Sequence, residues 1–462
     1  METLPRLGAT IELLAAQLRG ALIRPDEADY DAARAVWNGR FEKRPALIVR
    51  AADAGDVETA VRFAREADLP LSVRGAGHHA NAAGVCDAGI TIDLSGMKGL
   101  EIDLASNTAR AEPGLTTGEF LLAIHAQGRI VTVGSHSSVG LTGLTLGGGI
   151  GILNGKYGLT CDSLLSVEIV TADGILRTAS ATENADLFWA VRGGGGNFGV
   201  VTSLTYRLHP LEPMIAGMVF HPLPRLREML RFYREFVQSV PNELTVFAAI
   251  LTGPQGMAVA GMMACYTGPL DEGERLVAPL KAFGPPVMDI LQPMPYPGLL
   301  AALDAHDPPG AHYAFSCRGL PELTDAAIDE IVAAAETITS PGTAIVVYHL
   351  HGATCRIPVS ATAFAARETP HLLGIYTGWD GGDAAPHLAW LDAFRTAMEP
   401  HTNGSCCLSL TADDSAEAIS EAYGSNFARL QQIKDEWDPE NRFRHCYNVP
   451  PTAHDGSVGT NG

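Results

Sequence analysis

Positive charge and long apolar runs are both scarce in this chain. Lys and Arg number 32 against 52 Asp and Glu, so the formal net charge is −20 at pH 7. Such an acidic surface repels nucleic-acid phosphates and anionic lipids. No basic stretch followed by an apolar segment opens the sequence, and the apolar runs are short and broken by Gly, Pro or charge. We therefore expect a cytoplasmic protein without a nucleic-acid partner or a membrane span.

Cysteine is also sparse and unpatterned. The eight residues show no Cys-x-x-Cys spacing and are too few for a disulfide scaffold in a chain of 462 residues, so we expect reduced thiols. A metal centre would need ligands at fixed spacing, and neither a Cys cluster nor a His-Glu-x-x-His string is present. The sequence thus predicts no metal site.

Local patterns predict a protein of more than one lobe. In the first 206 residues, short β-rich runs alternate with helical patterns, whereas residues 208 to about 400 combine longer strand-like runs with Ala-rich helical stretches. The second pattern is typical of a sheet with helices on one side. The expected strands are 45–50, 69–73, 89–93, 165–170, 245–252 and 257–266. The expected helices are one that begins at the N-cap Asp56, 324–337 and 415–443.

Glycine is plentiful, and one cluster directly follows a predicted strand. Gly75-Ala-Gly77-His-His-Ala80 matches the pattern of a Rossmann dinucleotide site, which also requires a helix opening within the motif. Residues 81–89 are rich in Gly and Ala and lead into another strand, so no useful helix fits there. We reject the Rossmann interpretation. Consecutive backbone N–H groups in a glycine-rich turn bind phosphate without a helix, and Arg74 could add charge or brace the loop.

A series of sequence strings extends from residue 30 to residue 451. They are Tyr30-Asp31, Trp37-Asn38, Val73–His78, Ile92–Ser95, Gly143–Gly149, Lys156–Asp162, Asp186–Val200, Tyr423-Gly424, Asp438-Pro439 and Asn448–Pro451. In this order the strings resemble the berberine-bridge-enzyme-like FAD-linked oxidases of bacterial type, within the vanillyl-alcohol-oxidase superfamily. The resemblance covers nearly the whole chain.

The resemblance implies an α+β fold with two lobes. A PCMH-type FAD-binding domain is formed by both chain ends, and a substrate domain of antiparallel sheet plus helices is inserted between them. The matching limits are 1–207 for the first part of the FAD-binding domain, 208–405 for the substrate-binding domain, and 406–451 for the C-terminal part that completes the FAD domain. Residues 452–462 are polar and rich in Gly, so we expect a disordered tail there.

The resemblance also implies a covalent cofactor. The histidine at the position of His78 carries FAD through the flavin 8α-methyl group, and an ordinary loop histidine is the alternative. Many relatives have a second flavin bond, to a cysteine in a Cys-Pro-Thr-Val-Gly string; here the string is His136-Ser-Ser-Val139-Gly140. We therefore expect FAD with a single link, and a structural role for Cys161. Val139 stands where the family controls oxygen access, and valine resembles the oxygen-permissive type.

The expected FAD-binding residues follow from the matched strings. They are Arg74, Gly75, Ala76, Gly77, His78, His79, Ser138, Val139, Gly143, Leu144, Gly148, Gly149, Gly199, Val200, Tyr447 and Asn448.

Flavin oxidation requires a base that takes a proton while hydride moves to the flavin. In relatives, tyrosines serve as this base. The candidates here are Tyr447 in the C-terminal string and Tyr376 in the strand-like run 372–376. An ordinary tyrosine pKa near 10 must be depressed for this role, and a half-buried core tyrosine is the alternative for each. His136 is a third catalytic candidate, facing the flavin or the substrate, with a packed histidine as the alternative.

Two further features concern the substrate. His349 and His351 alternate in a strand pattern, so both point to one face, either a substrate wall or a solvent-facing pair. Cys407 and Ser409 stand where many relatives have Tyr and Asn, in a predicted strand 406–410. One usual active-site tyrosine is therefore missing, which allows a substrate different from that of sugar-oxidising members.

The leading interpretation is an FAD-dependent oxidase that uses O2 and releases H2O2. Its small-molecule substrate is an alcohol, a sugar or a natural-product intermediate, and oxidative cyclisation in secondary metabolism is one form of the reaction. The alternatives are a flavin dehydrogenase with another acceptor and a non-catalytic flavin-binding protein. The intact glycine strings disfavour the last. A dinucleotide-dependent dehydrogenase is the remaining alternative.

Overall fold

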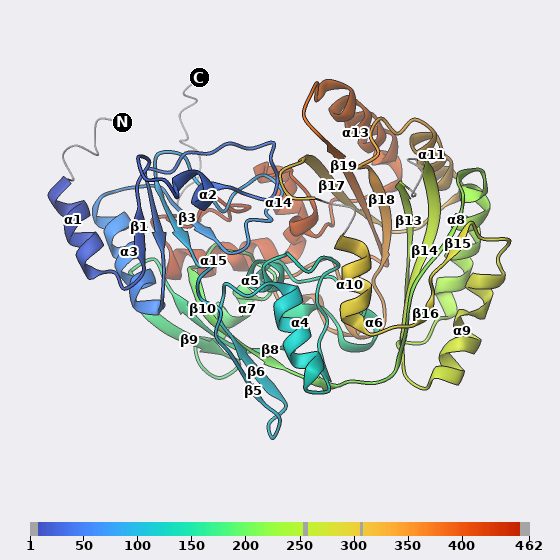
Figure 1. Cartoon of the computed structure of the whole chain (residues 1–462), viewed down its shortest axis with the longest axis horizontal. Coiled ribbons are helices and arrows are strands. Elements are labelled where there is room, and N and C mark those ends of the chain that lie inside the picture. Colours follow the sequence, from blue (N-terminus) through green and yellow to red (C-terminus); the bar gives the residue numbers. More distant parts are fainter. Residues whose placement is uncertain (1–7, 253–256, 305–307, 453–462) are drawn as a thin grey trace.

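The computed structural model describes residues 8–252, 257–304 and 308–452, and the chain forms two lobes that lie side by side (Figure 1). The predicted disordered tail, residues 452–462, lies outside these ranges apart from its first residue. We call the lobe with the chain's first eleven strands and its last two helices the first lobe, and the lobe with the remaining strands the second lobe.

The first lobe contains a small sheet in which the glycine loop follows a strand. Its order is β1 (Ala21–Ile23), β2 (Leu47–Arg50), β4 (Ile90–Asp93) and β3 (Leu71–Arg74), and β2 and β3 both run parallel to β4. Three of these strands were predicted to within two residues at either end. Parallel strands buried on both faces need continuous β-branched or apolar runs, which these segments supply.

The helix α3 (Ala54–Glu66) packs on this sheet, but its N-cap is Asp53 and not the predicted Asp56. The Asp53 carboxylate accepts the Asp56 N–H at 3.1 Å. The Asp56 side chain instead accepts three backbone N–H groups from outside the helix, those of Arg19, Gly20 and Ala52, each at 2.8 Å. The buried carboxylate therefore joins the helix to two neighbouring segments.

A second sheet of the first lobe is antiparallel. Its order is β5 (Leu100–Asp103), β6 (Thr108–Ala111), β10 (Val200–Arg207), β8 (Leu164–Val170) and β9 (Leu176–Ser180), and β7 (Arg129–Ile130) pairs with β11 (His209–Pro210) nearby. The other helices of this lobe are α1 (Gly8–Gln17), α2 (Tyr30–Arg34), α4 (Thr117–Ala126), α5 (Leu141–Leu146), α6 (Asn154–Tyr157), α7 (Ala185–Val191), α14 (Ala416–Tyr423) and α15 (Phe427–Trp437).

The C-terminal helices return to this lobe after the chain has formed the second one (Figure 1). The Lys434 ammonium of α15 is fully buried and donates to the carbonyls of Asn197 at 2.7 Å and Phe443 at 2.8 Å. Helix was predicted for the whole of 415–443, but α15 ends at Trp437 because residues 438–443 turn back. The Asp438 carboxylate holds that turn by accepting the N–H groups of Arg442 and Phe443.

The second lobe is a large antiparallel sheet whose outer face is covered by helices. Its strands are β12 (Met214–Pro222), β13 (Leu244–Thr252), β14 (Ala258–Thr267), β15 (Met288–Asp289), β16 (Gln292–Pro293), β17 (His312–Leu320), β18 (Ala344–His349) and β19 (His371–Trp379). The order is β15-β12-β14-β13-β18-β19-β17, and β16 also pairs with β12. The helices of the outer face are α8 (Leu226–Phe236), α9 (Leu270–Ala282), α11 (Asp325–Glu336) and α13 (Ala385–Met398), whereas α10 (Tyr296–Asp304) packs against α4 and α12 (Ala353–Arg356) against α6 of the first lobe.

The two faces of this sheet have different partners. Side chains alternate along each strand. Phe247 and Leu372 belong to the face toward the first lobe and share a buried cluster with Trp189 of α7. Their neighbours Ala248 and Leu373 belong to the outer face, in a cluster with α8, α9, α11 and α13. The predicted sheet with helices on one side is confirmed for α8, α9, α11 and α13, and the other face meets the first lobe and α10.

Two sequence predictions in this region are wrong. Residues 406–410 are not a strand; Leu408–Leu410 form a 3-10 turn, and the Cys407 thiol donates to the carbonyl of Gly147 at 3.8 Å. Packing against the end of α5 thus takes the place of strand pairing. The His349 side chain does not form part of a substrate wall on the sheet face toward the first lobe. It alternates with Tyr348 along β18 and therefore lies on the outer face. It is also not solvent-facing, because only 7% of it is exposed.

Three histidines form a buried cluster at the end of β18. His349 lies opposite His371 in the β18–β19 register, with ring centroids 5.3 Å apart, and His351 stacks on His349 at 4.4 Å. Burial, with weaker repulsion between the rings, lowers the pKa of His349 to about 2, and burial lowers those of His351 and His371 to about 4. All three imidazoles are therefore neutral in the folded protein at neutral pH.

This cluster predicts a loss of stability in acid. In the unfolded chain a histidine titrates near its ordinary pKa of about 6.5, so below that pH the unfolded state binds protons that the folded state excludes, and stability falls as the pH falls. His349→Leu is expected to reduce this slope by about 1.4 kcal/mol per pH unit between about pH 6 and 5, measured by urea unfolding. Equal slopes for His349→Leu and the wild type would contradict the prediction.

Candidate active site

The glycine loop begins where β3 ends and is braced by a buried carboxylate. Arg74 is the last residue of β3 and pairs in register with Asp93 of β4, whose side chain is fully buried. The Arg74 guanidinium donates to Asp93 at 3.1 Å, and Arg50 reaches the same carboxylate at 3.3 Å. Gly77 has φ +77°, which a side chain would strain. The structure shows no helix in 81–89, in agreement with the rejection of a Rossmann site.

Open space lies beside several glycines of the candidate site. A Cβ at Gly143 or Gly196 would have no described atom within 4 Å, and one at Gly75 would meet only the Pro113 carbonyl, at 3.8 Å. Buried polar atoms also lack partners here: Arg74 Nε and Asn448 Oδ1 have no hydrogen bond within the described ranges. Room for a ligand beside exposed backbone, with an unused donor and acceptor, fits a flat cofactor that carries phosphate, such as FAD.

Other predicted glycines serve the protein's own packing. Gly148, Gly149 and Gly199 all have positive φ, and a Cβ on each would come within 2.5 Å of Phe364, Thr160 or Val170 atoms respectively. Only their backbone can therefore contact a cofactor. The same holds for Val200, whose side chain is fully buried in the first lobe.

The segment 136–140 lies against the glycine loop. A Cβ at Gly140 would come within 3.1 Å of the Ala76 nitrogen. The Val139 carbonyl accepts the N–H of Thr117 at 2.8 Å, which holds the segment against the start of α4. Ser138 is exposed, Val139 and Leu144 are half-buried, and α5 follows from Leu141. The structure thus brings together two segments that the sequence assigned to FAD binding.

His78 lies in a stack of aromatic rings. Its imidazole stacks on Trp37 with centroids 4.9 Å apart and an angle of 22° between planes, and Trp37 stacks on Tyr313 of β17 at 4.0 Å and 14°. Burial, aided by repulsion from His136, lowers the pKa of His78 to about 4. The ring is therefore neutral at neutral pH, with a nitrogen lone pair free of a proton.

His79 contacts the C-terminal string. Its Nε2 lies 3.2 Å from the Cys446 sulfur, and its ring is 4.7 Å from that of Tyr447. Burial lowers the pKa of His79 to about 4 and raises that of Cys446 to about 11, so both are uncharged at neutral pH. Residues near both ends of the chain thus meet at the glycine loop.

His136 lies near His78 and beside an acidic residue from the second lobe. Its Nδ1 is 3.9 Å from Asp304 Oδ1, and the same oxygen accepts the Ser137 N–H at 2.8 Å. Charge on either residue affects the pKa of His78, which places both within its surroundings. The catalytic role of His136 stays a prediction. Cys161 is fully buried, and burial raises its pKa, as expected for a structural thiol.

Tyr447 has an unusual backbone and a bound hydroxyl. Its φ is +42°, its carbonyl accepts Asn197 Nδ2 at 3.1 Å, and its hydroxyl donates to the Thr411 carbonyl. Burial raises the pKa of Tyr447 well above 10, so the phenol keeps its proton. Its assignment as the base stays a prediction, and the geometry shows a hydrogen-bond donor to the Thr411 carbonyl.

Tyr376 belongs to a pair that the sequence did not reveal. Its hydroxyl lies 2.5 Å from that of Tyr348, and both side chains are on the face toward the first lobe. Burial raises the pKa of Tyr376 well above 10. A Cβ at Gly374 would come within 3.0 Å of both phenol rings, so only glycine leaves room for the pair. The alternation that placed His349 on one face places Tyr348 on the other, a signal available in the sequence.

Two other residues were missed as parts of the site. Trp37 and Asn197 both lie in matched strings, but no role was assigned to either. The Asn197 amide donates to the carbonyls of Gly194 and Tyr447 and accepts the N–H of Val449 at 3.0 Å. A buried Asn near a glycine run is the signal that could have identified it.

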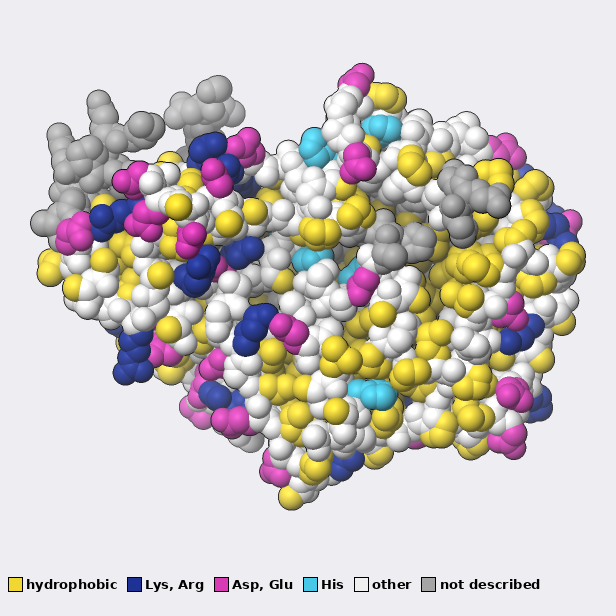
Figure 2. All heavy atoms as spheres, in the orientation of Figure 1, with side chains coloured by type: hydrophobic (Ala, Val, Ile, Leu, Met, Phe, Trp, Pro, Cys, Tyr) yellow, Lys and Arg dark blue, Asp and Glu magenta, His cyan; other side chains and the backbone are white. Residues whose placement is uncertain are grey.

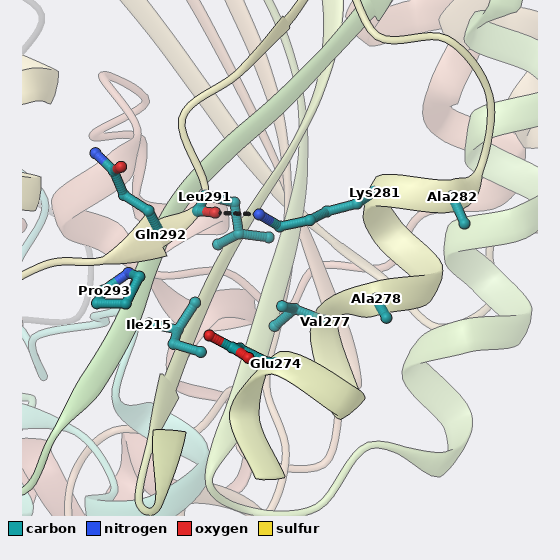
Figure 3. Close-up of a pocket in the computed structure, with 9 residues that line it drawn as sticks. All are labelled: Ile215, Glu274, Val277, Ala278, Lys281, Ala282, Leu291, Gln292 and Pro293. Carbon is teal, nitrogen blue, oxygen red and sulfur yellow. Dashed lines mark hydrogen bonds between the residues drawn. The ribbon is translucent and has the colours of Figure 1, made fainter. Parts of the chain in front are cut away.

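A cavity and an apolar surface lie in the second lobe, outside the candidate site. A cavity of about 490 Å³ lies between α9 and the strands β12 and β16, on the outer face of the large sheet (Figure 3). Lys281 points into it and donates to the Leu291 carbonyl. On the face shown in Figure 2, hydrophobic side chains gather over the second lobe, and histidines reach the surface where the lobes meet. No helix in the described part of the chain is long and apolar enough to cross a membrane.

Comparison with known proteins gives two family matches. Residues 45–180 match the model described as FAD binding domain, and residues 408–450 match the model described as berberine and berberine like. (R)-6-hydroxynicotine oxidase from Paenarthrobacter nicotinovorans is 32% identical, covering 94% of this chain and 97% of that protein. An FAD-linked oxidoreductase from Dictyostelium discoideum is 31% identical over 98% of this chain and 99% of its own length.

Two solved structures show the same overall fold as this chain. 6-Hydroxy-D-nicotine oxidase from Arthrobacter nicotinovorans superposes with a TM-score of 0.84 at 28% identity, covering 94% of this chain and 98% of that one. An Acremonium strictum glucooligosaccharide oxidase has a TM-score of 0.86 at 23% identity over 96% and 98% of the two chains, which shows a shared fold. The predicted α+β fold of PCMH type is confirmed, and the chain belongs to the berberine-bridge-enzyme-like family of FAD-linked oxidoreductases.

Proposed function

We propose that the protein is an oxidase that takes hydride from a small organic molecule onto FAD and passes the electrons to O2, releasing H2O2. A series of aromatic rings carries the proposal. It runs from His78 to Trp37 at 4.9 Å, from Trp37 to Phe315 at 6.2 Å, and from Phe315 to Tyr376 at 5.4 Å. A continuous series of ring contacts therefore connects the predicted flavin anchor with the phenol pair of the large sheet.

The cofactor is proposed to be FAD with a single covalent link to His78. His136 replaces the cysteine that would make a second link, and Cys161 is buried away from solvent. When bound, FAD would supply an acceptor for hydride, which is one proton with two electrons. The loop 75–79, the segment 138–144 and Asn448 would hold it, and the hydroxyl of Tyr447 keeps its proton as a donor.

The domain limits at residues 207 and 405 are part of the proposal. They are supported by the end of β10 at Arg207, the start of β12 at Met214, and the return of the chain to the first lobe after α13.

The side chains on the sheet face toward the first lobe support the proposal that the substrate is uncharged and contains rings. On β13, β17, β18 and β19 the described residues of this face include no charged side chain, and it presents Phe247, Phe315, Tyr348 and Tyr376. Apolar and aromatic walls exclude water and favour flat ligands over oligosaccharides, which need many hydrogen bonds. The relative named (R)-6-hydroxynicotine oxidase, whose named substrate is a small compound with rings, supports a substrate of this kind.

Anaerobic bleaching of the flavin absorbance tests this function. The enzyme is mixed with secondary alcohols and amines that contain aromatic rings, and in parallel with oligosaccharides, and air is then admitted. We expect the ring compounds to bleach the flavin, and O2 to restore its colour with one H2O2 per turnover. Slow recovery in air would instead identify a dehydrogenase with another acceptor, and no bleaching by any compound would favour a non-catalytic protein.

Removing the Tyr376 hydroxyl tests the phenol pair. Tyr376→Phe deletes a group within hydrogen-bond distance of Tyr348 while leaving the ring, so kcat is expected to fall about 100-fold with KM little changed. Tyr266→Phe is the matched control, because that hydroxyl binds Glu272 on the outer face. Steady-state kinetics on a substrate from the panel measure both. An unchanged kcat in Tyr376→Phe would remove the pair from the reaction.

A further inference from the structure

Trp37 is built into the surroundings of His78 from two sides. Its indole ring lies between the imidazole of His78 and the phenol ring of Tyr313, nearly parallel to both. Its backbone N–H donates to the Gly77 carbonyl at 3.1 Å, one residue before His78. Ring and backbone therefore constrain the same short stretch of the glycine loop.

The neighbouring Asn38 ties this stretch to the second lobe. Its fully buried amide donates to the carbonyls of Ala80 at 2.8 Å and Tyr313 at 3.0 Å, and its Oδ1 accepts the Tyr313 N–H at 3.0 Å. The amide thus binds both backbone groups of the residue whose ring stacks behind Trp37. Asn38 holds Tyr313, Tyr313 supports Trp37, and Trp37 supports His78.

From this arrangement we propose that Trp37 is a positioning residue for covalent attachment of the flavin, holding the His78 imidazole in the orientation in which its nitrogen reaches the 8α-methyl carbon. The inference rests on the proposed link to His78. It assigns a role to a side chain that does not itself bond to the cofactor.

The attachment step shows why orientation matters. One C–H bond of the methyl group and the N–H bond of His78 break, and a C–N bond forms. Two electrons pass to the flavin ring and then to O2, which leaves with both protons as H2O2. The nitrogen attacks as a neutral imidazole, and His78 is neutral at pH 7 because burial lowers its pKa to about 4. Without the indole, the imidazole would be free to rotate and would be hydrated on one face.

The experiment compares covalent and total FAD in purified wild type, Trp37→Leu and Trp37→Phe. Protein incubated with excess FAD in air is split into two samples, one for total bound flavin and one precipitated with acid to count flavin that stays with the chain. At equal total FAD, Trp37→Leu is expected to attach flavin about tenfold more slowly, because a misplaced reacting group slows a step of this kind. Trp37→Phe, which keeps a ring, should retain at least half of the wild-type rate.

The pH profile of attachment separates positioning from folding. Hydration in Trp37→Leu should raise the pKa of His78 toward its ordinary value of about 6.5, so its attachment rate should fall more steeply than that of the wild type from about pH 8 to 6. His136 and Asp304, the groups that face His78, are the same in both proteins, so their titration contributes equally. Trp437→Leu, which removes a half-buried indole at the end of α15, should match the wild type throughout.

The possible outcomes of this experiment distinguish the role of Trp37 from the link to His78. Covalent attachment in Trp37→Leu at the wild-type rate and with the wild-type pH profile would overturn the inference. If that variant does not fold, Tyr313→Leu takes its place, and it should slow attachment because Trp37 loses its support. A wild-type protein without covalent flavin would instead refute the proposed link to His78, a result that the acid precipitation of wild type alone decides.

Discussion

Replacing His78 by Ala is expected to convert a protein that keeps its flavin through acid precipitation into one that releases all of it. The half-buried imidazole lies at the glycine loop and is neutral at neutral pH, as a nucleophile must be. Mass spectrometry of the His78-containing peptide should show a flavin adduct in the wild type and none in the variant. Because a covalent bond also fixes the ring for hydride transfer, we expect kcat to fall about 100-fold or more even at saturating FAD.

His79→Ala is the matched control for this change. His79 is next in sequence and is also half-buried, but its nitrogen contacts the Cys446 sulfur. It should keep the covalent flavin, although its C-terminal contact is lost. Acid-stable flavin in His78→Ala, or an adduct that reaches a cysteine, would contradict the single link.

Breaking the ion pair between Arg367 and Asp162 is expected to cause the largest loss of stability. The exposed fractions of the two side chains are 0% and 4%, and their closest N–O distance is 2.6 Å. The guanidinium also donates to the Thr354 carbonyl and the Thr362 hydroxyl. Arg367→Met would leave a buried carboxylate without its partner, which costs about 3–5 kcal/mol.

Urea unfolding and FAD content measure this effect together. Asp162 follows Cys161, whose N–H binds the Gly148 carbonyl at 3.0 Å, so loosening this turn should also weaken FAD binding. Arg231→Met removes an exposed partner of Asp325 and should change the free energy of unfolding by less than about 1 kcal/mol. A similar small change in Arg367→Met would show that the buried pair contributes little.

Sequence patterns predicted most strands well because the residues that determine each strand lie within the strand itself and its flanking turns. The runs 45–50 and 89–93 are apolar and β-branched and are bounded by turn residues, so their strands do not depend on distant contacts. Asp56 was misassigned because Asp53 and Asp56 both suit a helix start. Three N–H groups from outside the helix distinguish them, two of them from residues more than 30 positions away.

The candidate site was predicted as a set of segments but not as an arrangement. The glycine loop, and the hypothesis that it binds phosphate, followed from residues 74–89 alone. The stack of His78, Trp37 and Tyr313 did not, because Asn38 and Tyr313 are 275 positions apart and only the folded chain brings them together. Tyr348 was overlooked although the alternation was read correctly, because the sequence does not say which face of a strand will meet the other lobe.

The meeting of both chain ends at one site has a consequence for biosynthesis. Asn197 binds the backbone of Tyr447 and Val449, about 250 positions later, and His79 contacts Cys446. A ribosome makes the glycine loop well before residues 446–449. We therefore expect flavin capture to wait until these residues have emerged, so products that terminate before Cys446 should remain colourless.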